Sequence, residues 1–521
     1  MTRAAAPAAG GPGSPDRRLD WRFLTGYPGV HTVARFSRSG DFFGALESMA
    51  VEVVEGQHAP DASAELAVGD DPDLATLQRM AAVLTPGGAC VVVLNSSMDR
   101  ALALCRAAGF ADPRPYLPWP SGDWPRAWVP LDDDAASRRV LSGGSGHGYR
   151  SHVTALRQRR WLTNGRRGQR GALYVVCRRT TGSPGALSSP ALPWPGAWPT
   201  AAVGPVPERL TLTMLTGGRE SVSKVIVIVT GADARTGTPG LAVKWPRTAL
   251  AGRGLRREAA HLQALATSSP ELLASIPALI GTCDTAVGPG LVESLVEGLP
   301  LGPRVHRGVH SAVARSATEW LAQLVRPEPP DREGTRRAVD SISRTFEELV
   351  HGAVDTRLLQ SSRQLLQSLG PLPVVVEHRD LAPWNVLVNR SGSMRVVDWE
   401  SAVLVGLPFL DLWYFLTWAA LAVERRPERR LAGAYGRLAD PRGQTGSVSQ
   451  NASRQYAHLL HLPLDTLHPL RALTWMVHVP SELARLQARS PDRPLTEHVR
   501  TSTFVRLWAQ EVAQFASKGR V

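Results

Sequence analysis

The sequence predicts a multidomain protein of the α/β plus α+β class, in which an N-terminal α/β domain precedes a two-lobed part. Three observations support this prediction. Helical and apolar extended segments alternate between residues 64 and 108, which is typical of a parallel α/β sheet. Runs rich in β-formers gather between residues 211 and 244. Helical periodicity dominates from residue 410 onward, so we expect a β-rich lobe followed by a helical lobe.

The length sets the number of domains. A chain of 521 residues with 43% hydrophobic content can form two to four domains with real cores. From shifts in composition we expect a disordered tail at 1–19, an α/β domain at 20–180, a Pro/Gly-rich linker at 181–206, a β-rich lobe at 207–297 and a helical lobe at 298–521.

The α/β domain is predicted from five segments. A strand at Glu65–Val68 precedes a helix at Leu74–Leu84, and a strand at Ala89–Leu94 precedes a helix at Asp99–Ala108. A closing strand is expected at Ala172–Arg178. Short apolar strands that alternate with helices favour parallel pairing.

The LTPGG turn (residues 84–88) and the AAGF helix end (residues 107–110) resemble the second half of class I S-adenosylmethionine-dependent methyltransferases. Such an enzyme needs a glycine-rich turn after its first strand, so that the cofactor can approach the backbone closely. No G-x-G stands on such a strand between residues 20 and 65. The resemblance therefore implies a degenerate domain that serves as a scaffold or docking surface, and S-adenosylmethionine is not expected to bind.

The segment Pro371–Glu400 carries the strongest chemical signal. His378-Arg379-Asp380 is followed five residues after the aspartate by Asn385, and Asp398 ends a short apolar run. Phosphoryl transfer needs one carboxylate that orients the acceptor hydroxyl, and an amide and a second carboxylate that hold magnesium ions. The alternative interpretation of the segment is an ordinary β-hairpin with solvated acids.

The parts that such a site needs stand upstream in the right order. Leu241-Ala242-Val243-Lys244 is an apolar strand ending in a lysine, and Glu258 lies on a helix with an apolar face. A lysine held by a carboxylate can neutralise nucleotide phosphates. Strands expected at Thr211–Thr216 and Lys224–Thr230 flank a Gly-Gly turn whose N–H groups could meet phosphates. Taken singly, these features also fit a surface lysine, a solvated helix face and a hairpin turn.

HRDLAPWNVLV (residues 378–388) resembles the catalytic loop of the aminoglycoside phosphotransferase and choline kinase-like family of small-molecule kinases. VVDWE (396–400) resembles its metal-binding strand, and LVEGLPLG (295–302) resembles the connection between its lobes. The resemblance covers residues 207–521. It implies a bilobal protein kinase-like fold with a β-rich N-lobe and a helical C-lobe.

The resemblance also implies roles for single residues. Asp380 would be the catalytic base. Asn385 and Asp398 would hold Mg²⁺, and Lys244 with Glu258 would bind the phosphates of ATP or GTP. The other implied residues are, for nucleotide binding, Gly217, Gly218, Ser221, Glu293 and Leu295, and, for structural support of the site, His378 and Asp411.

Departures from the pattern of protein kinases favour a small-molecule acceptor. The position two residues after Asp380, where many protein kinases have a lysine, is Ala382. Asp398 is not followed by Phe-Gly, and no A-P-E segment is present in the sequence. Trp384 fits either a rigid apolar wall beside the catalytic aspartate or an ordinary core tryptophan.

Acceptor recognition is expected on the C-terminal helices at Leu470–Gln487 and Phe504–Ala516, with a mobile loop at Arg442–Ser453. Acidic residues there would bind a cationic acceptor. The region offers few of them, namely Glu482, Glu497 and Glu511. A polycationic acceptor is therefore not strongly indicated, and a sugar, a nucleoside or a lipid-linked alcohol stays possible.

Charge and cysteine content narrow the partners and the compartment. The net charge of +13 comes almost wholly from arginine, with a dense run at Arg157–Arg170. The run fits a polyanion-binding loop or, preferably, a solvated surface loop, so nucleic acid is not expected as a partner. The four cysteines lack metal-site or disulfide spacing. Leu410–Val423 is apolar but too short to span a membrane. We expect a cytoplasmic location.

The sequence thus predicts an ATP- or GTP-dependent kinase that transfers a γ-phosphoryl group to a hydroxyl of a sugar, an aminoglycoside or a related metabolite. Two alternatives stay open. One is a non-catalytic scaffold made of a pseudokinase and a pseudo-methyltransferase. The other is an active methyltransferase with an accessory kinase-like domain. The oligomeric state is not predicted.

Overall fold

The computed structural model of the protein describes residues 17–25, 30–36, 46, 50–119, 125–133, 173–179, 199–205, 207, 210–216, 224–231, 240–285, 288–389, 391–424, 431–440 and 442–518. The chain divides into two compact units. The first unit comprises residues 1–256 and 279–295, and the second comprises residues 257–278 and 296–521.

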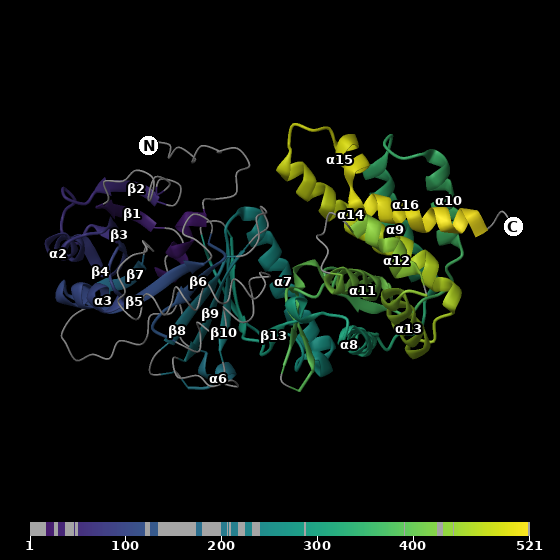
Figure 1. Ribbon diagram of the computed structural model, residues 1–521, viewed down its shortest axis with the longest axis horizontal. Helices are drawn as coiled ribbons and strands as arrows, with labels where there is room; N and C mark the ends of the chain where they lie inside the picture. The colour runs from purple at the N-terminus through teal and green to yellow at the C-terminus, as the bar shows by residue number, and fades with distance from the viewer. Residues whose placement is uncertain are drawn as a thin grey trace. The chain divides into compact units, whose positions relative to one another are not determined.

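The first unit is built on one mixed β-sheet, whose strand order is β11-β12-β10-β9-β8-β6-β5-β7-β4-β3-β1-β2 (Figure 1). The strands are β1 Val30–Arg35, β2 Ala50–Glu55, β3 Ala64–Asp70, β4 Leu84–Leu94, β5 Phe110–Trp119, β6 Ala127–Pro130, β7 Leu173–Arg179, β8 Leu210–Leu215, β9 Lys224–Gly231, β10 Leu241–Pro246, β11 Leu279–Cys283 and β12 Gly290–Ser294. The helical segments are η1 Arg17–Thr25, α2 Leu74–Val83, α3 Met98–Ala107 and α6 Thr200–Val203.

Strands β1, β2, β3 and β4 pair in parallel, and β7 lies antiparallel between β4 and β5. This part of the sheet has the parallel pairing and the alternating helices that the sequence predicts. Strands β8 to β12 pair antiparallel, so the complete sheet is mixed.

Side chains along the strands alternate between two faces of the sheet, because successive residues of a strand point to opposite sides. On β4, Val91 and Val93 belong to one buried cluster, while Cys90 and Val92 belong to the other. Helices α2 and α3 pack on the second face against β3, β4, β5 and β7 (Figure 1). The first face is covered in part by η1, whose Trp21 is fully buried.

A short ladder joins the N-terminal strands to the strands that follow. Ala127 and Trp128 of β6 pair with Leu215 and Met214 of β8. The Thr211 hydroxyl donates to Asp133 Oδ2 over 2.6 Å. One apolar cluster includes core residues from both sides of this junction. The strands on either side of the predicted linker thus form a single sheet, while the predicted domain boundaries stay predictions.

The second unit is mainly helical. Besides residues 257–268 of α7 (Ala249–Ser268), its helices are α8 His310–Ala322, α9 Arg332–Val350, α10 Thr356–Gln367, α11 Leu410–Val423, α12 Leu431–Ala439, α13 Gln444–Leu459, α14 Leu467–Arg489, α15 Leu495–Thr501 and α16 Thr503–Lys518. Short 3₁₀ segments are η3 Pro270–Leu272, η4 Gly302–Arg304, η5 Trp399–Ser401 and η7 Leu464–Thr466. Its small strands are β13 Leu299–Pro300, β14 Val375–Glu377, β15 Val386–Val388, β16 Met394–Val396 and β17 Val403–Gly406.

Helix α11 lies at the centre of this unit and is buried along almost its whole length. It packs against α8, α12, α13 and α14, and α14 lies beside α16 (Figure 1). A helix that is apolar all round is expected in such a position. Among the described residues, no helix combines the length and the apolar character that crossing a membrane requires.

The mobile loop predicted at Arg442–Ser453 is wrong, because α13 begins at Gln444. Two of its serines satisfy their hydroxyls within the helix: Ser449 donates to Thr445 O over 3.0 Å, and Ser453 donates to Ser449 O over 2.7 Å. Both serines are buried, and α13 packs on α8. Tertiary burial of small polar residues here outweighs their weak helix preference.

Candidate active site

The predicted catalytic loop connects β14 to β15 in the second unit, and His378 links it to the strand of the predicted metal ligand. The backbone N–H of Asp380 donates to His378 Nδ1 over 3.2 Å. The proton of the imidazole therefore lies on Nε2, which donates to Val397 O over 3.1 Å. Val397 N–H in turn donates to Asn385 O over 3.0 Å. These bonds hold the loop and the strand in one register.

Asp380 and Asn385 lie in contact. The Asn385 side-chain N–H₂ group donates to Asp380 Oδ2 and to Asp380 O, each over 2.9 Å. The Tyr414 hydroxyl lies 3.4 Å from Asp380 Oδ1. Burial, followed by the charge of Asp398, raises the pKa of Asp380 to about 7. A carboxylate with such a pKa can accept a proton near neutral pH.

Asp411, at the start of α11, holds the backbone of the loop. Its carboxylate accepts the N–H of His378 over 2.6 Å and the N–H of Arg379 over 2.8 Å. Burial and the neighbouring charge of Glu377 raise the pKa of Asp411 to about 7. Arg379 adopts a left-handed φ of 62°, which costs free energy unless the surroundings hold it.

Glu377 is a second buried carboxylate beneath the loop, and the sequence did not single it out. It accepts Leu407 N–H over 2.6 Å and pairs with Arg379 Nε over 2.7 Å. Only 1% of Glu377 is exposed. Asp411 therefore fixes the backbone that leads to Asp380, while Glu377 holds the Arg379 side chain and ties it to the segment before α11.

Asp398, the predicted metal ligand, follows β16 by two residues and has a left-handed φ of 73°. The next residue, Trp399, is held by α7: its N–H donates to Glu258 Oε1 over 3.0 Å, and its carbonyl lies 2.8 Å from His261 Nδ1. Glu258 is fully buried. The structure thus brings Glu258 next to the Asp398 segment, a contact that the sequence did not predict.

Lys244 belongs to the first unit and forms an ion pair there with Glu293 on the neighbouring strand, at 2.9 Å. Both side chains are nearly completely buried. Leu295 N–H donates to Gly240 O over 2.8 Å. The predicted pairing of Lys244 with Glu258 joins residues of the two units and stays a prediction. So does the nucleotide-binding role of Glu293 and Leu295.

The donor set suits a hard divalent cation. Because the Asn385 side-chain nitrogen donates to Asp380, its amide oxygen is the atom that could ligate Mg²⁺, together with the Asp398 carboxylate. Magnesium in kinase-type sites takes one or two protein oxygens and completes its shell with phosphates and water. No cluster of three or more histidine, cysteine or acidic residues able to hold a metal occurs within the residues that the structure covers. A site that shares its metal with phosphate does not require one.

Three predicted nucleotide-binding residues, Gly217, Gly218 and Ser221, lie outside the described residues, as does the arginine run at 157–170. Tyr414 is a site residue that the sequence analysis missed. It stands three residues after Asp411 on the same helix, a spacing that places both on one face. That spacing could have revealed it.

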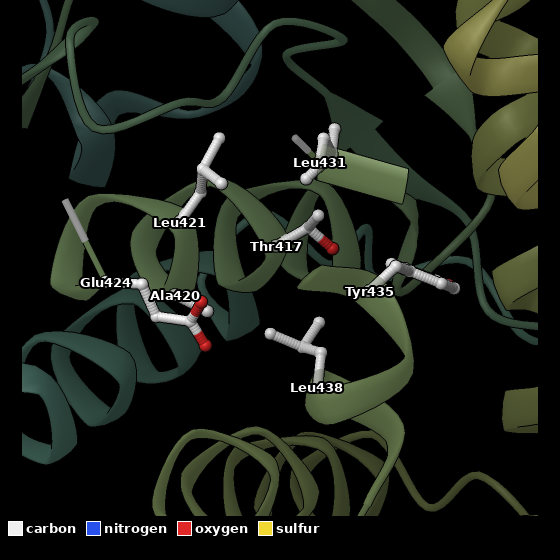
Figure 2. A pocket seen from close by; sticks show the side chains of 7 residues that line it. All are labelled: Thr417, Ala420, Leu421, Glu424, Leu431, Tyr435 and Leu438. Carbon is white, nitrogen blue, oxygen red and sulfur yellow. The ribbon is translucent and has the colours of Figure 1, made fainter. Parts of the chain in front are cut away.

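A small pocket in the second unit does not belong to the site. It lies between α11 and α12, and Figure 2 shows mainly apolar side chains around it. Thr417 and Glu424 add polar atoms, and Glu424 pairs with Arg437 over 2.6 Å. None of the lining residues carries a predicted catalytic group.

Comparison with known families identifies the class of protein that this site defines. Residues 221–444 match the family model described as the phosphotransferase enzyme family. The match includes Lys244, Glu258 and the whole catalytic loop, and it confirms the family resemblance that the loop suggested. This part of the chain is a phosphotransferase with an alcohol group as acceptor.

Solved structures of similar proteins come from the same group. The chain is 14% identical to a candidate aminoglycoside phosphotransferase from Ralstonia eutropha, with a TM-score of 0.41, covering 59% of this chain and 93% of that one. It is 12% identical to the choline kinase LicA from Streptococcus pneumoniae, with a TM-score of 0.36 and coverage of 57% and 92%. It is 17% identical to the macrolide 2'-phosphotransferase MphH from Brachybacterium faecium, with a TM-score of 0.36 and coverage of 57% and 96%. No curated protein matches the chain. The family match, and not these structures, carries the assignment.

The methyltransferase resemblance of the N-terminal part is not confirmed and stays a prediction. At the carboxyl end of β1, the Phe36 ring fills the space beside Gly56, where an added Cβ would lie 2.1 Å from a ring carbon. Arg35 there pairs with Glu55. Among the described residues, the carboxyl end of β1 thus carries a phenyl ring and an ion pair.

Proposed function

We propose that the protein is a kinase that transfers the γ-phosphoryl group of ATP or GTP to a hydroxyl of a small molecule. One observation carries this proposal. The buried Asp380 is poised near neutral pKa and hydrogen bonded to Asn385, with Asp398 close enough to raise its pKa. Magnesium and a cytoplasmic location are part of the proposal.

The residues of the second unit have separate tasks in this reaction. Asp380 aligns the acceptor hydroxyl and takes its proton while the oxygen–phosphorus bond forms and the bond to the bridging β-oxygen breaks. Asn385 and Asp398 hold magnesium, which when bound neutralises charge on the phosphates. Tyr414 limits the directions in which the Asp380 carboxylate can point, because its hydroxyl lies 3.4 Å from Oδ1.

The residues of the first unit bind the nucleotide. Lys244 is buried and forms an ion pair with Glu293, and we propose that its ammonium group contacts the phosphate oxygens of the nucleotide. We further propose that Glu258 completes this charge arrangement. Its side chain reaches the backbone directly after Asp398, which supports a role in coupling nucleotide binding to the metal-binding strand.

The test is Asp380→Asn in the full chain. The amide cannot accept the hydroxyl proton, so we expect turnover to fall by about 10²- to 10⁴-fold. Binding of Mg-ATP, measured as a rise in melting temperature, should persist. Asp340→Asn, on an exposed face of α9, serves as the matched control and should keep full activity. Equal turnover in wild type and Asp380→Asn would contradict the proposal.

A further inference from the structure

Aromatic side chains, and not acidic ones, gather beside the catalytic carboxylate. Tyr414 approaches Asp380, and its ring stacks on His478 of α14 with centroids 3.9 Å apart and an angle of 17° between the planes. His478 is buried. Burial lowers the pKa of His478 to about 3, so its imidazole is neutral and adds an apolar surface at working pH.

Trp384 extends this group toward solvent. It stands one residue before Asn385, and 50% of it is exposed, so it is not a core tryptophan. Its ring makes an edge contact with the ring of Trp418 on α11, with the ring centroids 4.9 Å apart. The rings of Trp418 and Tyr414 also meet edge-on, with centroids 6.0 Å apart. We call Trp384, Trp418, Tyr414 and His478 the aromatic wall. An exposed indole held at its edge offers a flat face to a ligand.

The acidic residues considered for cation binding have other partners. Glu482 accepts the N–H groups of Thr503 and Phe504, each over 2.9 Å, at the start of α16. Glu511 is fully buried and accepts the Tyr435 hydroxyl over 2.6 Å. These carboxylates stabilise helix packing, so they are not placed to pair with a polycation.

Glu497, the third of these acids, pairs at the surface with Arg493 over 3.5 Å. The charges around Asp380 are mixed, because Asp398 and Glu400 raise its pKa while Arg485 lowers it. Arg485 of α14 lies close enough to Asp380 to favour its charged form, and close enough to His478 to disfavour protonation of that ring. A polycationic acceptor would therefore find the three C-terminal carboxylates engaged elsewhere, and Arg485 would add a like charge near Asp380.

We infer that the acceptor is an alcohol with a flat aromatic or apolar face, bound against the aromatic wall, and is not a polycation. The inference rests on the proposed function, since it names the substrate class of the same site. The flat face would pack on Trp384, and its hydroxyl would meet Asp380. An anionic group on the acceptor would gain from Arg485.

The experiment measures acceptor-dependent ATP consumption by the full chain with matched acceptors. Phenyl β-glucoside and methyl β-glucoside differ only in the aryl group, and phenyl β-glucuronide adds a carboxylate to the former. Aryl alcohols and uridine present an aromatic ring on other carbon skeletons. Kanamycin is the polycationic acceptor. We expect uncharged or anionic aryl-bearing acceptors to exceed kanamycin and methyl glucoside in kcat/KM by at least about tenfold.

Variants locate the effect. Trp384→Ala should raise KM for the best acceptor by about 5- to 100-fold with a small change in kcat, and Trp384→Phe should restore most of the affinity, because stacking needs only a ring. Arg485→Gln should weaken binding of the anionic acceptor selectively, by about 3- to 10-fold, and Arg485→Lys should restore it. Unchanged melting temperatures show that the variants are folded.

The outcomes separate the two proposals. Higher kcat/KM with kanamycin, an unchanged KM in Trp384→Ala, or turnover with no member of the set in a protein that binds Mg-ATP would each overturn the inference and leave the kinase assignment standing. Failure to bind Mg-ATP at all would overturn the proposed function, and with it this inference.

Discussion

The two units hold their polar site residues in different ways. In the first unit, Lys244 sits within a strand and is paired with Glu293 on the next strand, inside an extended sheet. In the second unit, Asp380 and Asp398 sit on loops, and Asp398 itself has left-handed backbone geometry. In the sheet, the regular pairing of two strands brings the charged Lys244 and Glu293 side chains together. In the loops, the reactive side chains stand on or beside residues with strained backbone conformations, and buried neighbouring residues must stabilise that strain.

Those partners are the lesson of the comparison. Asp411 accepts the backbone N–H groups of His378 and Arg379, and Glu377 pairs with the Arg379 side chain and accepts Leu407 N–H. Glu258 and His261 of α7 hold Trp399 after Asp398. A regular strand needs no such brace. Chemistry in the second unit should therefore respond to changes in residues that never touch substrate, whereas the first unit should respond mainly through its stability.

Among substitutions in the second unit, removal of the proposed metal ligand Asp398 should have the largest effect. Asp398→Asn weakens the charge that holds magnesium, so we expect turnover to fall by about 10²- to 10³-fold. Raising the magnesium concentration should recover part of the loss, which titration of activity with Mg²⁺ will measure. Full activity at low magnesium would remove Asp398 from the site.

The contribution of buried charge pairs to the stability of the first unit is best tested at the Arg247–Asp20 ion pair. Arg247, three residues after Lys244, donates to Asp20 of η1 over 2.7 and 3.2 Å, and both side chains are almost fully buried. Arg247→Met removes both hydrogen bonds to buried Asp20 and leaves it only the 3.9 Å contact with Arg22, which should cost up to about 3–5 kcal/mol of unfolding free energy. Chemical denaturation followed by circular dichroism measures the loss.

Arg336→Met is the matched control for that variant. Arg336 pairs with Glu333 over 2.9 Å, but both side chains are more than half exposed. Removal of this pair should change the unfolding free energy by less than about 1 kcal/mol. Equal effects of the two substitutions would show that the Asp20 pair contributes no more than a solvated one.

A pH series sharpens the comparison for Asp380. Burial raises its pKa to about 7 in the folded protein, well above the ordinary unfolded value. The folded state thus binds more protons than the unfolded state between about pH 4 and 7, and the free energy of unfolding falls as pH rises through that window. Asp380→Asn should remove the part of the fall that Asp380 causes and stabilise the protein at pH 7.5 by up to about 4 kcal/mol, while Asp411, whose pKa is also raised to about 7, should still contribute its own part. Melting temperatures of both proteins across pH 4–8 check this.

Activity should rise with pH over the range in which the free energy of unfolding falls. The base form of Asp380 prevails above its pKa, so kcat/KM should rise about tenfold per pH unit below pH 7 and level off above it. A pH-independent kcat/KM between 5 and 8 would argue against Asp380 as the proton acceptor.

The smallest expected effect lies at the junction within the sheet. Thr211→Val removes the 2.6 Å hydrogen bond to Asp133 and keeps the shape of the side chain. We expect a loss of about 1–2 kcal/mol. A single cooperative unfolding transition in this variant, seen by fluorescence and circular dichroism alike, would show that the N-terminal strands and the Lys244 strands unfold together.

Local patterns predicted the parts of the site that are close in sequence. The spacing of Asp380, Asn385 and Asp398 and the strands around them are set by a short segment, and α11 begins and ends at the predicted residues. Burial could not be predicted. From the sequence, Trp384 could equally form a wall beside the catalytic aspartate or belong to the core. Its 50% exposure in the structure excludes the core position.

Long-range partners were beyond the sequence for a physical reason. Asp20 and Arg247 are 227 residues apart, and no periodicity relates them. Lys244 was expected to pair with Glu258 on a helix, and that pairing stays a prediction. Its ion pair with Glu293 was not predicted; it forms because the antiparallel register places Ala242 opposite Glu293, which brings the Lys244 and Glu293 side chains to one face of the sheet. Register depends on the whole sheet and cannot be read from one strand.

The ladder between β6 and β8 has a practical consequence for anyone who would cut this chain at the start of its kinase-like part. A fragment beginning near Pro207 would lose β6, which covers one side of β8. The exposed N–H and C=O groups of β8 would then form a free edge of the kind that recruits other chains. Such a fragment should precipitate or self-associate even though every proposed catalytic residue is present. The N-terminal strands would thus keep the kinase-like part soluble by covering the edge of β8.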